Sequence, residues 1–375
     1  MKIGFYIDEM NLRGVANSTY LYALNNEKIL KNKSIIFYNK KNFRNKNKVI
    51  KKFKKKFTCI GVSSFKEIEL FKEKFDLNFL YTQKSGNKDN WISKKIRTIV
   101  HAAYPQTLNE IHGYNFAYVS EWLSHKFSNR KIPFVPYITE SKKTKSNLRN
   151  KLKIKKEYLV FGCHGGDSSF DMKFVQTAVA NVAHNRKDIF FLFLNINKFF
   201  HHPQVIFLKG TTDEDYKKRF INSCDAMIYG RSLGESFGMA CAEFAVQNKD
   251  ILSYKFNRHR CHKYNSEQSK YFEYSSYQSL NKILINYKKK RLSSKRKSKY
   301  HKYSVKKVMR DFEQFFLKQK IVLNISIMDY ISNYYNFFLM GYFYFRHKLY
   351  NHYFNFFYSK FLSNRLIKLK NDYTN

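Results

Sequence analysis

Short apolar runs alternate with helical or basic segments along most of this chain, and this alternation constrains its fold more than any other feature. The first half contains the strand-like runs KIGFYI, SIIFYN, FTCIGV, FLYTQ and TIVHAAYP. A helical stretch from Asn17 to about Leu30 and the segment KEIELFKEKF lie between some of them. The segment NFAYVSEWLSHKF predicts a further strand that turns into a helix at Ser120. Strand–helix alternation of this kind predicts a doubly wound parallel sheet.

The same pattern starts again after a polar, lysine-rich stretch. EYLVFG, DIFFLFLN, QVIFLKG and AMIYG form a second series of apolar runs. A chain of 375 residues is long enough for two domains and an appendage. We therefore predict α/β domains at 1–137 and 157–318, a basic linker or docking helix at 138–156, and an extension at 319–375. Parallel sheets bind ligands beyond their strand ends, so the expected site is a cleft between the two domains.

The segment RSLGESFGMACAEFA carries two glutamates eight positions apart, with a Phe-Gly pair soon after the first. Its glycines let the backbone approach a ligand closely. With the preceding VIFLKGTTDEDYKKRFINSCDAMIYG, this segment resembles the nucleotide-binding half of the GT-B retaining glycosyltransferases, whose mark is Glu, seven residues and a second Glu. The resemblance covers most of residues 1–318 and is strongest from Val205 to Ala245. A loop glutamate followed by a solvated helix glutamate is the alternative interpretation.

The resemblance implies a GT-B fold, in which two Rossmann-like domains face a central cleft, and it implies donor-binding residues in the second domain. Glu235 is expected to contact the donor hexose as a catalytic residue, and Glu243 to contact the ribose of the nucleotide. The amides of Ser236, Phe237 and Gly238 are expected at a helix N-terminus. Free N–H groups and the helix dipole attract a diphosphate there.

Two further site residues are expected in the first domain. Gly14 matches the family's glycine loop that faces the cleft, although an ordinary turn would also explain it. His101 follows the apolar run TIV at the expected carboxyl edge of the sheet, where the family often places a catalytic histidine beside the donor sugar. A surface loop histidine explains His101 equally well, and His112, before Gly113, is a second candidate.

Two loops of the second domain complete the expected donor site. The first, GCHGGDSSFD, contains Gly165 and Gly166, whose backbone suits contact with a phosphate or an acceptor. The second contains Thr211 and Thr212, which fall where the family contacts the nucleotide. Turn formation would explain the two threonines equally well.

The first of these loops departs from the commonest family pattern, in which an arginine and a lysine clamp the diphosphate. Cys163 and His164 stand near the arginine position, and Ser168 or Ser169 near the lysine position. Lys173, a few positions later, is a candidate to replace that lysine. The sequence therefore leaves the phosphate clamp unassigned.

The chain is strongly basic, with 70 Lys+Arg against 28 Asp+Glu and a formal net charge of +42. Such a surplus steers nucleic acid, anionic membranes or phosphorylated substrates toward a protein. The lysines are spread throughout and accompany many Asn, Tyr, Phe and Ile residues, which is typical of AT-rich codons. We give this compositional explanation the larger share.

No metal or resident cofactor is expected. The five cysteines form no CxxC pair, and Cys261 and His262 near His259 make a weak metal signal. No DxD motif stands in the expected context of the other common transferase fold. The resemblance implies a UDP- or GDP-linked sugar as co-substrate, retention of configuration and no catalytic metal.

The extension is aromatic, since 15 of the 29 residues from Tyr330 to Tyr358 are Phe or Tyr. Three interpretations compete: a helical addition that packs on the first domain, an anchor at a membrane surface, and a platform for single-stranded nucleic acid. Aromatics around most of a helix favour packing, with the membrane surface second and nucleic acid last. No signal peptide or membrane-spanning run is apparent, so a cytoplasmic location is expected, with peripheral membrane contact through the extension.

The expected function is therefore transfer of a sugar from a nucleotide donor to a hydroxyl of a glycan, a lipid or another acceptor. One rival is a GT-B nucleotide-sugar epimerase, which needs additional acid–base groups near the sugar. The other is a binding protein, either an inactive transferase subunit or a nucleic-acid binder.

Overall fold

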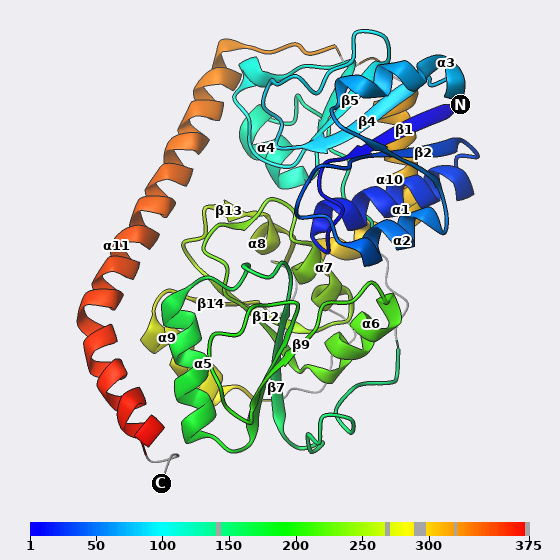
Figure 1. The fold of residues 1–375 in the computed structure, drawn as a ribbon. Coiled ribbons are helices and arrows are strands. Elements are labelled where there is room, and N and C mark those ends of the chain that lie inside the picture. Colours follow the sequence, from blue (N-terminus) through cyan, green and yellow to red (C-terminus); the bar gives the residue numbers. More distant parts are fainter. Residues whose placement is uncertain (140–143, 267–270, 289–297, 319, 321, 372–375) are drawn as a thin grey trace.

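The computed structural model describes residues 1–139, 144–266, 271–288, 298–318, 320 and 322–371, with side chains described up to residue 356. Two α/β domains lie one above the other in Figure 1, and a long helix runs beside both. Residues 140–143 of the expected linker and the last four residues of the expected extension lie outside the described part.

The first domain is built on a parallel sheet of six strands in the order β3-β2-β1-β4-β5-β6. Its central strand is buried along nearly its whole length, as expected for a parallel sheet covered on both faces. The five apolar runs and the strand predicted before Ser120 all form strands here. The strands are β1 Lys2–Ile7, β2 Lys33–Asn39, β3 Thr58–Val62, β4 Phe79–Lys84, β5 Arg97–Ala102 and β6 Asn115–Tyr118.

Helices cover both faces of this sheet. The first helix begins three residues before the expected position, directly at Gly14. Ser120 caps the fourth helix, because its hydroxyl accepts a hydrogen bond from the Leu123 N–H at 3.3 Å. The helical segments are α1 Gly14–Lys28, α2 Asn47–Lys54, η1 Lys66–Phe71, α3 Lys72–Phe75, η2 Leu108–Glu110 and α4 Glu121–Ser128.

The second domain repeats this plan with the order β14-β12-β10-β7-β8-β9. A small parallel pair, β11 with β13, lies beside the main sheet. The strands are β7 Leu159–His164, β8 Ile189–Leu194, β9 Val205–Leu208, β10 Ala226–Tyr229, β11 Gly234–Glu235, β12 Asp250–Tyr254, β13 His259–Arg260 and β14 Tyr271–Tyr274. The helical segments are α5 Lys173–Asn185, α6 Glu214–Ser223, α7 Met239–Val246, α8 Cys261–Ser266, α9 Tyr277–Asn286 and η3 Lys299–Lys302. The two-domain α/β architecture predicted from the apolar runs is thus confirmed.

The chain then returns to the first domain through α10, Val305–Phe312, and the π-helical turn η4, Glu313–Lys318. Phe312 stacks on Tyr22 at 5.4 Å and lies 5.7 Å from the ring of Tyr81, a residue of β4. Phe316 follows it into the same cluster and lies 5.2 Å from the ring of His101. The segment 305–318 was expected to belong to the second domain, but it packs on the sheet of the first domain.

The last helix, α11 Ile327–Asn371, runs along one side of the molecule and touches both domains (Figure 1). At its start, Phe337 lies 5.1 Å from the ring of Phe127 in α4. Further along, Tyr350 lies 5.1 Å from the ring of Phe174 in α5. The extension is thus helical as expected, but it packs on both domains and not on the first alone. Within the described residues, none of the helices combines the length and the apolar character needed to cross a membrane.

We predict that Phe312→Ala lowers the free energy of unfolding by about 3–5 kcal/mol, because the ring is fully buried among aromatic side chains of the first sheet. Urea denaturation followed by circular dichroism would measure the change. Phe43→Ala is the matched control, since Phe43 is 88% exposed and its loss should cost at most about 0.5 kcal/mol. Equal effects of the two changes would contradict the assignment of α10 to the core of the first domain.

Candidate functional site

A cavity of about 670 Å³ lies between the two domains. Residues that follow the carboxyl ends of four strands line it: Asp8 after β1, Ser85 after β4, Gly165 after β7 and Arg231 near the end of β10. The carboxyl edges of both sheets therefore open into the same space, which is where open parallel sheets bind ligands. The cleft expected from the sequence is present.

The Phe-Gly turn of the second domain forms part of the cavity wall. Gly238 has φ of +88° and precedes the first residue of α7, so a side chain there would strain the backbone. Gly234, with φ of +73°, passes so close to β13 that a Cβ would lie 2.0 Å from the carbonyl oxygen of His259. These two glycines allow the tight path from β10 to α7.

Helix α7 begins two residues later than the expected diphosphate site requires. Because α7 starts at Met239, the first-turn N–H groups belong to Gly238, Met239 and Ala240, and all three residues line the cavity. Ser236 and Phe237 line it too, but their carbonyl groups are held from outside: by the Ser120 hydroxyl at 2.6 Å and the Tyr300 hydroxyl at 2.7 Å. The expected amide set is therefore shifted along the chain by two residues.

Glu243 lies on α7 and faces the cavity between two basic groups. Its Oε1 accepts a hydrogen bond from Lys217 Nζ at 2.6 Å, and its Oε2 lies 2.9 Å from His164 Nε2. Burial would raise the pKa of this carboxyl, but attraction to Lys217 and His164 outweighs burial and holds the pKa well below its usual range. The carboxylate is thus ionised and fixed in position.

Glu235 belongs to β11 and also faces the cavity. Its Oε1 accepts hydrogen bonds from the Tyr229 hydroxyl at 2.8 Å and from Arg231 at 3.1 Å. Attraction to Glu235 is the largest effect on Arg231 and raises the pKa of its guanidinium. The pair brings one negative and one fixed positive charge to the cavity wall.

His101 is not at the cavity, which corrects its expected place beside the donor sugar. It lies within β5 and is fully buried, with Nδ1 2.7 Å from the Tyr81 hydroxyl and Nε2 2.8 Å from the carbonyl oxygen of Val135. Burial lowers the pKa of its imidazole to about 3, so the ring is neutral. The run TIV continues as strand through Ala102, so the histidine lies inside the sheet and not after its end.

The remaining predicted donor-site residues all line the cavity: Gly14, Gly165, Gly166, Thr211 and Thr212. Thr211 also makes a turn contact, because its hydroxyl accepts a hydrogen bond from the Asp213 N–H at 2.9 Å.

The alternative His112 is not among the lining residues, and its Nδ1 lies 2.6 Å from the carbonyl oxygen of Glu110. Among the residues that the structure describes, no cluster of three or more His, Cys, Asp or Glu side chains is arranged to hold a metal.

The sequence interpretation missed all five Lys and Arg side chains that line the cavity, among them Lys217, Arg13 and Lys52. Lys217 sits one turn after Asp213, which caps the start of α6 through its Oδ1, and it lines the cavity. Arg13 and Lys52 come from the first domain and contact the second, at Asp167 and Glu214. Only the cap at Asp213 is a sequence signal, and it does not single out one lysine among so many.

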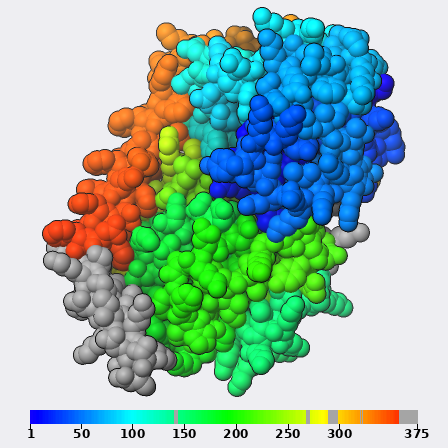
Figure 2. All heavy atoms as spheres, in the orientation of Figure 1, coloured from blue at the N-terminus to red at the C-terminus, as the bar shows by residue number. Residues whose placement is uncertain are grey.

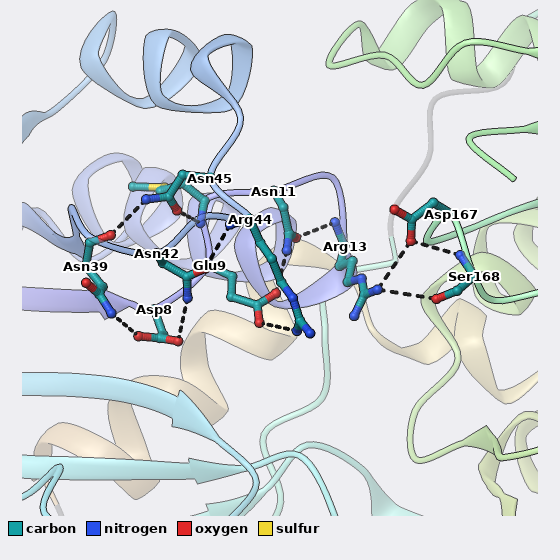
Figure 3. A network of polar contacts seen from close by, with 11 residues as sticks. Asp8, Glu9, Asn11, Arg13, Asn39, Asn42, Arg44, Asn45, Asp167 and Ser168 are labelled. Carbon is teal, nitrogen blue, oxygen red and sulfur yellow. Dashed lines mark hydrogen bonds and ion pairs between the residues drawn. The ribbon is translucent and has the colours of Figure 1, made fainter. Parts of the chain in front are cut away.

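Figure 3 shows how Arg13 reaches across the cleft from the loop after β1. Its guanidinium lies 3.3 Å from Asp167 and 3.4 Å from the Ser168 hydroxyl. The same loop is held from behind, because Asp8 accepts hydrogen bonds from Asn39 at 2.8 Å and Asn42 at 2.9 Å (Figure 3). Arg13 is therefore carried by a rigid loop, while its own ion pair is half exposed and weak.

Comparison with known proteins shows which solved structures share this architecture. No protein-family model matches the chain, and no curated protein sequence matches it significantly. Solved structures do match. MnaA from S. aureus with UDP aligns at a TM-score of 0.59 and 11% identity, over 84% of this chain and 96% of its own. Anabaena HepE with UDP and glucose aligns at a TM-score of 0.57 and 11% identity, over 76% of this chain and 89% of its own. A glycosyltransferase from Rickettsia africae aligns at a TM-score of 0.53 and 12% identity, over 91% of this chain and 98% of its own.

The chain has the GT-B fold. Both sheets of the GT-B architecture are complete here, and the helical extension is added to them. The identities are low, so the likeness establishes the fold, while the function has to be argued from the cavity.

We predict that Glu243→Gln lowers the free energy of unfolding at neutral pH by about 1–3 kcal/mol, because Lys217 and His164 lose a buried anionic partner. A carboxyl whose pKa is depressed on folding stabilises the native state above its unfolded pKa, and this contribution is lost as the pH falls through the folded pKa. The wild type should therefore lose stability below about pH 4.3 more steeply than the variant.

Urea titrations between neutral and acidic pH would measure both effects. Glu157→Gln, at an exposed glutamate outside the cavity, controls for the loss of one carboxylate. Parallel acid profiles of the wild type and Glu243→Gln would show that the contacts of Glu243 do not stabilise the fold.

Proposed function

We propose that this protein is a glycosyltransferase that takes a sugar from a nucleoside-diphosphate donor and transfers it to a hydroxyl acceptor. One observation carries the proposal: both glutamates of the motif, the start of α7 and five cationic side chains of both domains line the same interdomain cavity. The cations are Arg13, Lys52, Lys84, Lys217 and Arg231. A UDP-linked sugar is the favoured donor within the UDP- or GDP-linked class, because the HepE and MnaA structures hold UDP.

The donor's charges fit the second-domain wall. The N–H groups of Gly238 and Met239 at the start of α7 suit the diphosphate. Carboxylate oxygens accept hydrogen bonds from hydroxyls, so Glu243 suits the ribose, and its two basic neighbours keep it ionised.

The phosphate clamp is supplied across the cleft in this proposal. Arg13 passes over Gly166 so closely that a Cβ there would lie 3.2 Å from its Nε. Its weak contact with Asp167 can be exchanged for a charge-assisted hydrogen bond to phosphate, which is stronger and can be bidentate. An arginine of the first domain then does what the family's arginine and lysine do from the second domain.

Catalysis would rest on Glu235 and the diphosphate itself. Glu235, held by Tyr229 and Arg231, orients the donor sugar, and the acceptor hydroxyl attacks from the side on which the diphosphate leaves. The departing oxygens accept the proton and stabilise the cationic sugar, while cations and α7 amides stabilise the leaving charge. Retention and independence from a catalytic metal are parts of this proposal. His101 has no part in it, since it lies in the core.

The first-domain wall suits a saccharide acceptor. Asp8, Glu9, Asn17, Asp89 and Trp91 line the cavity on this side. Carboxylate and amide oxygens accept hydrogen bonds from hydroxyl groups, and an aromatic ring covers the apolar face of a sugar ring. We therefore place the acceptor glycan, free or attached to a lipid, against this wall.

Epimerisation of a nucleotide sugar is the second candidate. A UDP-N-acetylglucosamine 2-epimerase structure aligns at a TM-score of 0.53 and 10% identity, over 87% of this chain. Such a reaction needs acid and base groups at the sugar carbon that is inverted. Consumption of the donor without any acceptor, with formation of its epimer, would favour this candidate over the transferase.

We predict that UDP binds the wild type and that Arg13→Ala weakens this binding about tenfold, because a charge-assisted hydrogen bond to the diphosphate is lost. Asp167→Asn is the matched variant: it removes the same cross-cleft ion pair but leaves the arginine, so UDP should bind at least as tightly as to the wild type. Isothermal titration calorimetry with UDP, GDP, ADP and UMP would measure this. Equal losses in the two variants would mean that the ion pair, and not a phosphate contact, is what Arg13 contributes.

We further predict that Glu235→Gln lowers kcat of sugar transfer by about 100- to 1,000-fold, because a group that acts at the reacting sugar is lost. The affinity for UDP, which lacks the sugar, should change less than about threefold. Product formation with UDP-sugars and saccharide acceptors would be followed by mass spectrometry. A variant that loses UDP affinity and activity in parallel would place Glu235 at the nucleotide and not at the sugar.

A further inference from the structure

Helix α11 carries a continuous row of exposed apolar side chains on the face turned away from both domains. The row is formed by Ile331, Tyr335, Phe338, Tyr342, Phe345 and Leu349, all of them exposed. Their spacing is four, three, four, three and four residues, which matches one face of an α-helix. At a rise of about 1.5 Å per residue the row is about 27 Å long. We call these six residues the outer row.

The opposite face of the same helix is already occupied by the protein. Asn333 is buried there and donates hydrogen bonds to the carbonyl oxygens of Phe127 at 2.7 Å and Gln106 at 3.0 Å. Met340 and Phe354 are buried on this side as well. Packing on the domains therefore accounts for one apolar face of α11, and the outer row is a second one. Monomeric proteins rarely expose an apolar surface this continuous unless it is an interaction site.

The charges beside the outer row are all positive. No Asp or Glu occurs from residue 330 to residue 371, whereas the same stretch holds Arg346, Lys348, Lys360, Arg365, Lys368 and Lys370. Arg346 and Lys348 are exposed next to the row, and the whole chain has a formal net charge of +42. Two such surfaces would repel each other, so charge disfavours a second copy of this chain as the occupant. An anionic surface with an apolar interior is complementary to both features.

We propose that the outer row is a docking surface for an anionic lipid membrane, on which α11 lies parallel to the bilayer plane. Tyrosine, phenylalanine and leucine enter the boundary between headgroups and acyl chains, and the flanking cations pair with anionic headgroups. Helix α11 packs on both domains (Figure 2), so docking would hold the whole molecule beside the membrane. The inference goes beyond the proposed transferase activity, since no step of that reaction requires it.

The test is co-sedimentation of the full chain with vesicles of phosphatidylcholine alone or mixed with phosphatidylglycerol. The wild type should bind the mixed vesicles, weakly or not at all the neutral ones, and less tightly as salt is raised. The variant Phe338→Ser/Phe345→Ser/Leu349→Ser should reduce the partition coefficient on mixed vesicles at least about 100-fold, because three apolar side chains no longer enter the bilayer. Its residues are 71%, 64% and 58% exposed, so circular dichroism and the melting temperature should stay as in the wild type.

The matched control is Phe43→Ser/Leu70→Ser. These two side chains are 88% and 78% exposed on the first domain, away from α11, and the variant should bind mixed vesicles as the wild type does. The separate variant Lys348→Glu should weaken binding to mixed vesicles several-fold, because it replaces a cation beside the row with an anion.

A second readout reports the depth of the helix. In the Tyr342→Trp variant, lipids brominated on their acyl chains should quench the tryptophan fluorescence. The quenching should exceed that of the wild type, whose tryptophans are Trp91 and Trp122.

Three results would overturn the proposal. One is wild-type binding to mixed vesicles that the triple variant retains. Another is a dimer of the wild type in analytical ultracentrifugation that the triple variant abolishes, with no vesicle binding by either protein. The third is binding of a single-stranded RNA oligonucleotide that the triple variant loses, again without vesicle binding, which would make the outer row a stacking surface.

Discussion

The structure depends on the return of the chain from the second domain to the first. Phe312 and Phe316 enter an aromatic cluster of the first sheet, and the backbone N–H of Thr139 donates a hydrogen bond to the carbonyl of Tyr303 at 3.1 Å. The two crossings of the chain therefore lie side by side and fix which edges of the two sheets face each other. Because these are the carboxyl edges, loops that follow strand ends on both domains line the same cavity.

This arrangement explains the charge balance in the cavity. Lys217 carries a largely buried positive charge, and the carboxylate of Glu243, which lies between Lys217 and His164, offsets it. Arg231 and Glu235 form a second ion pair in the cavity wall. Charges fixed in this way need little rearrangement when a charged ligand enters, which is the condition for effective electrostatic stabilisation of a leaving group. Arg13 differs, since its exposed ion pair can be exchanged for a ligand.

Predictions from the sequence were accurate where they depended on residues close together in the chain, and they failed where long-range packing decides the position of a side chain. Glu235, Gly238 and Glu243 lie within nine positions of one another, so a strand–turn–helix pattern was enough to place them around one helix start. The shift of the free amides to Gly238, Met239 and Ala240 is a boundary effect of two residues. His101 was misplaced because the strand continues past it and turns its side chain into the core. No local sequence pattern shows whether a single side chain near the end of a strand points into the core or toward the cavity.

The sequence by itself determined the two parallel sheets, the glycine turn with its two glutamates and the helical, aromatic extension, because each follows from periodicity or backbone sterics within a short segment. Only the tertiary structure decided which cations serve the cavity. Lys217 and Arg13 are two among 70 lysines and arginines, and 204 positions separate them in the sequence. The tertiary structure also decided which side of α11 stays exposed, since the outer row and the packed face are both apolar in sequence. Long-range packing alone distinguishes them.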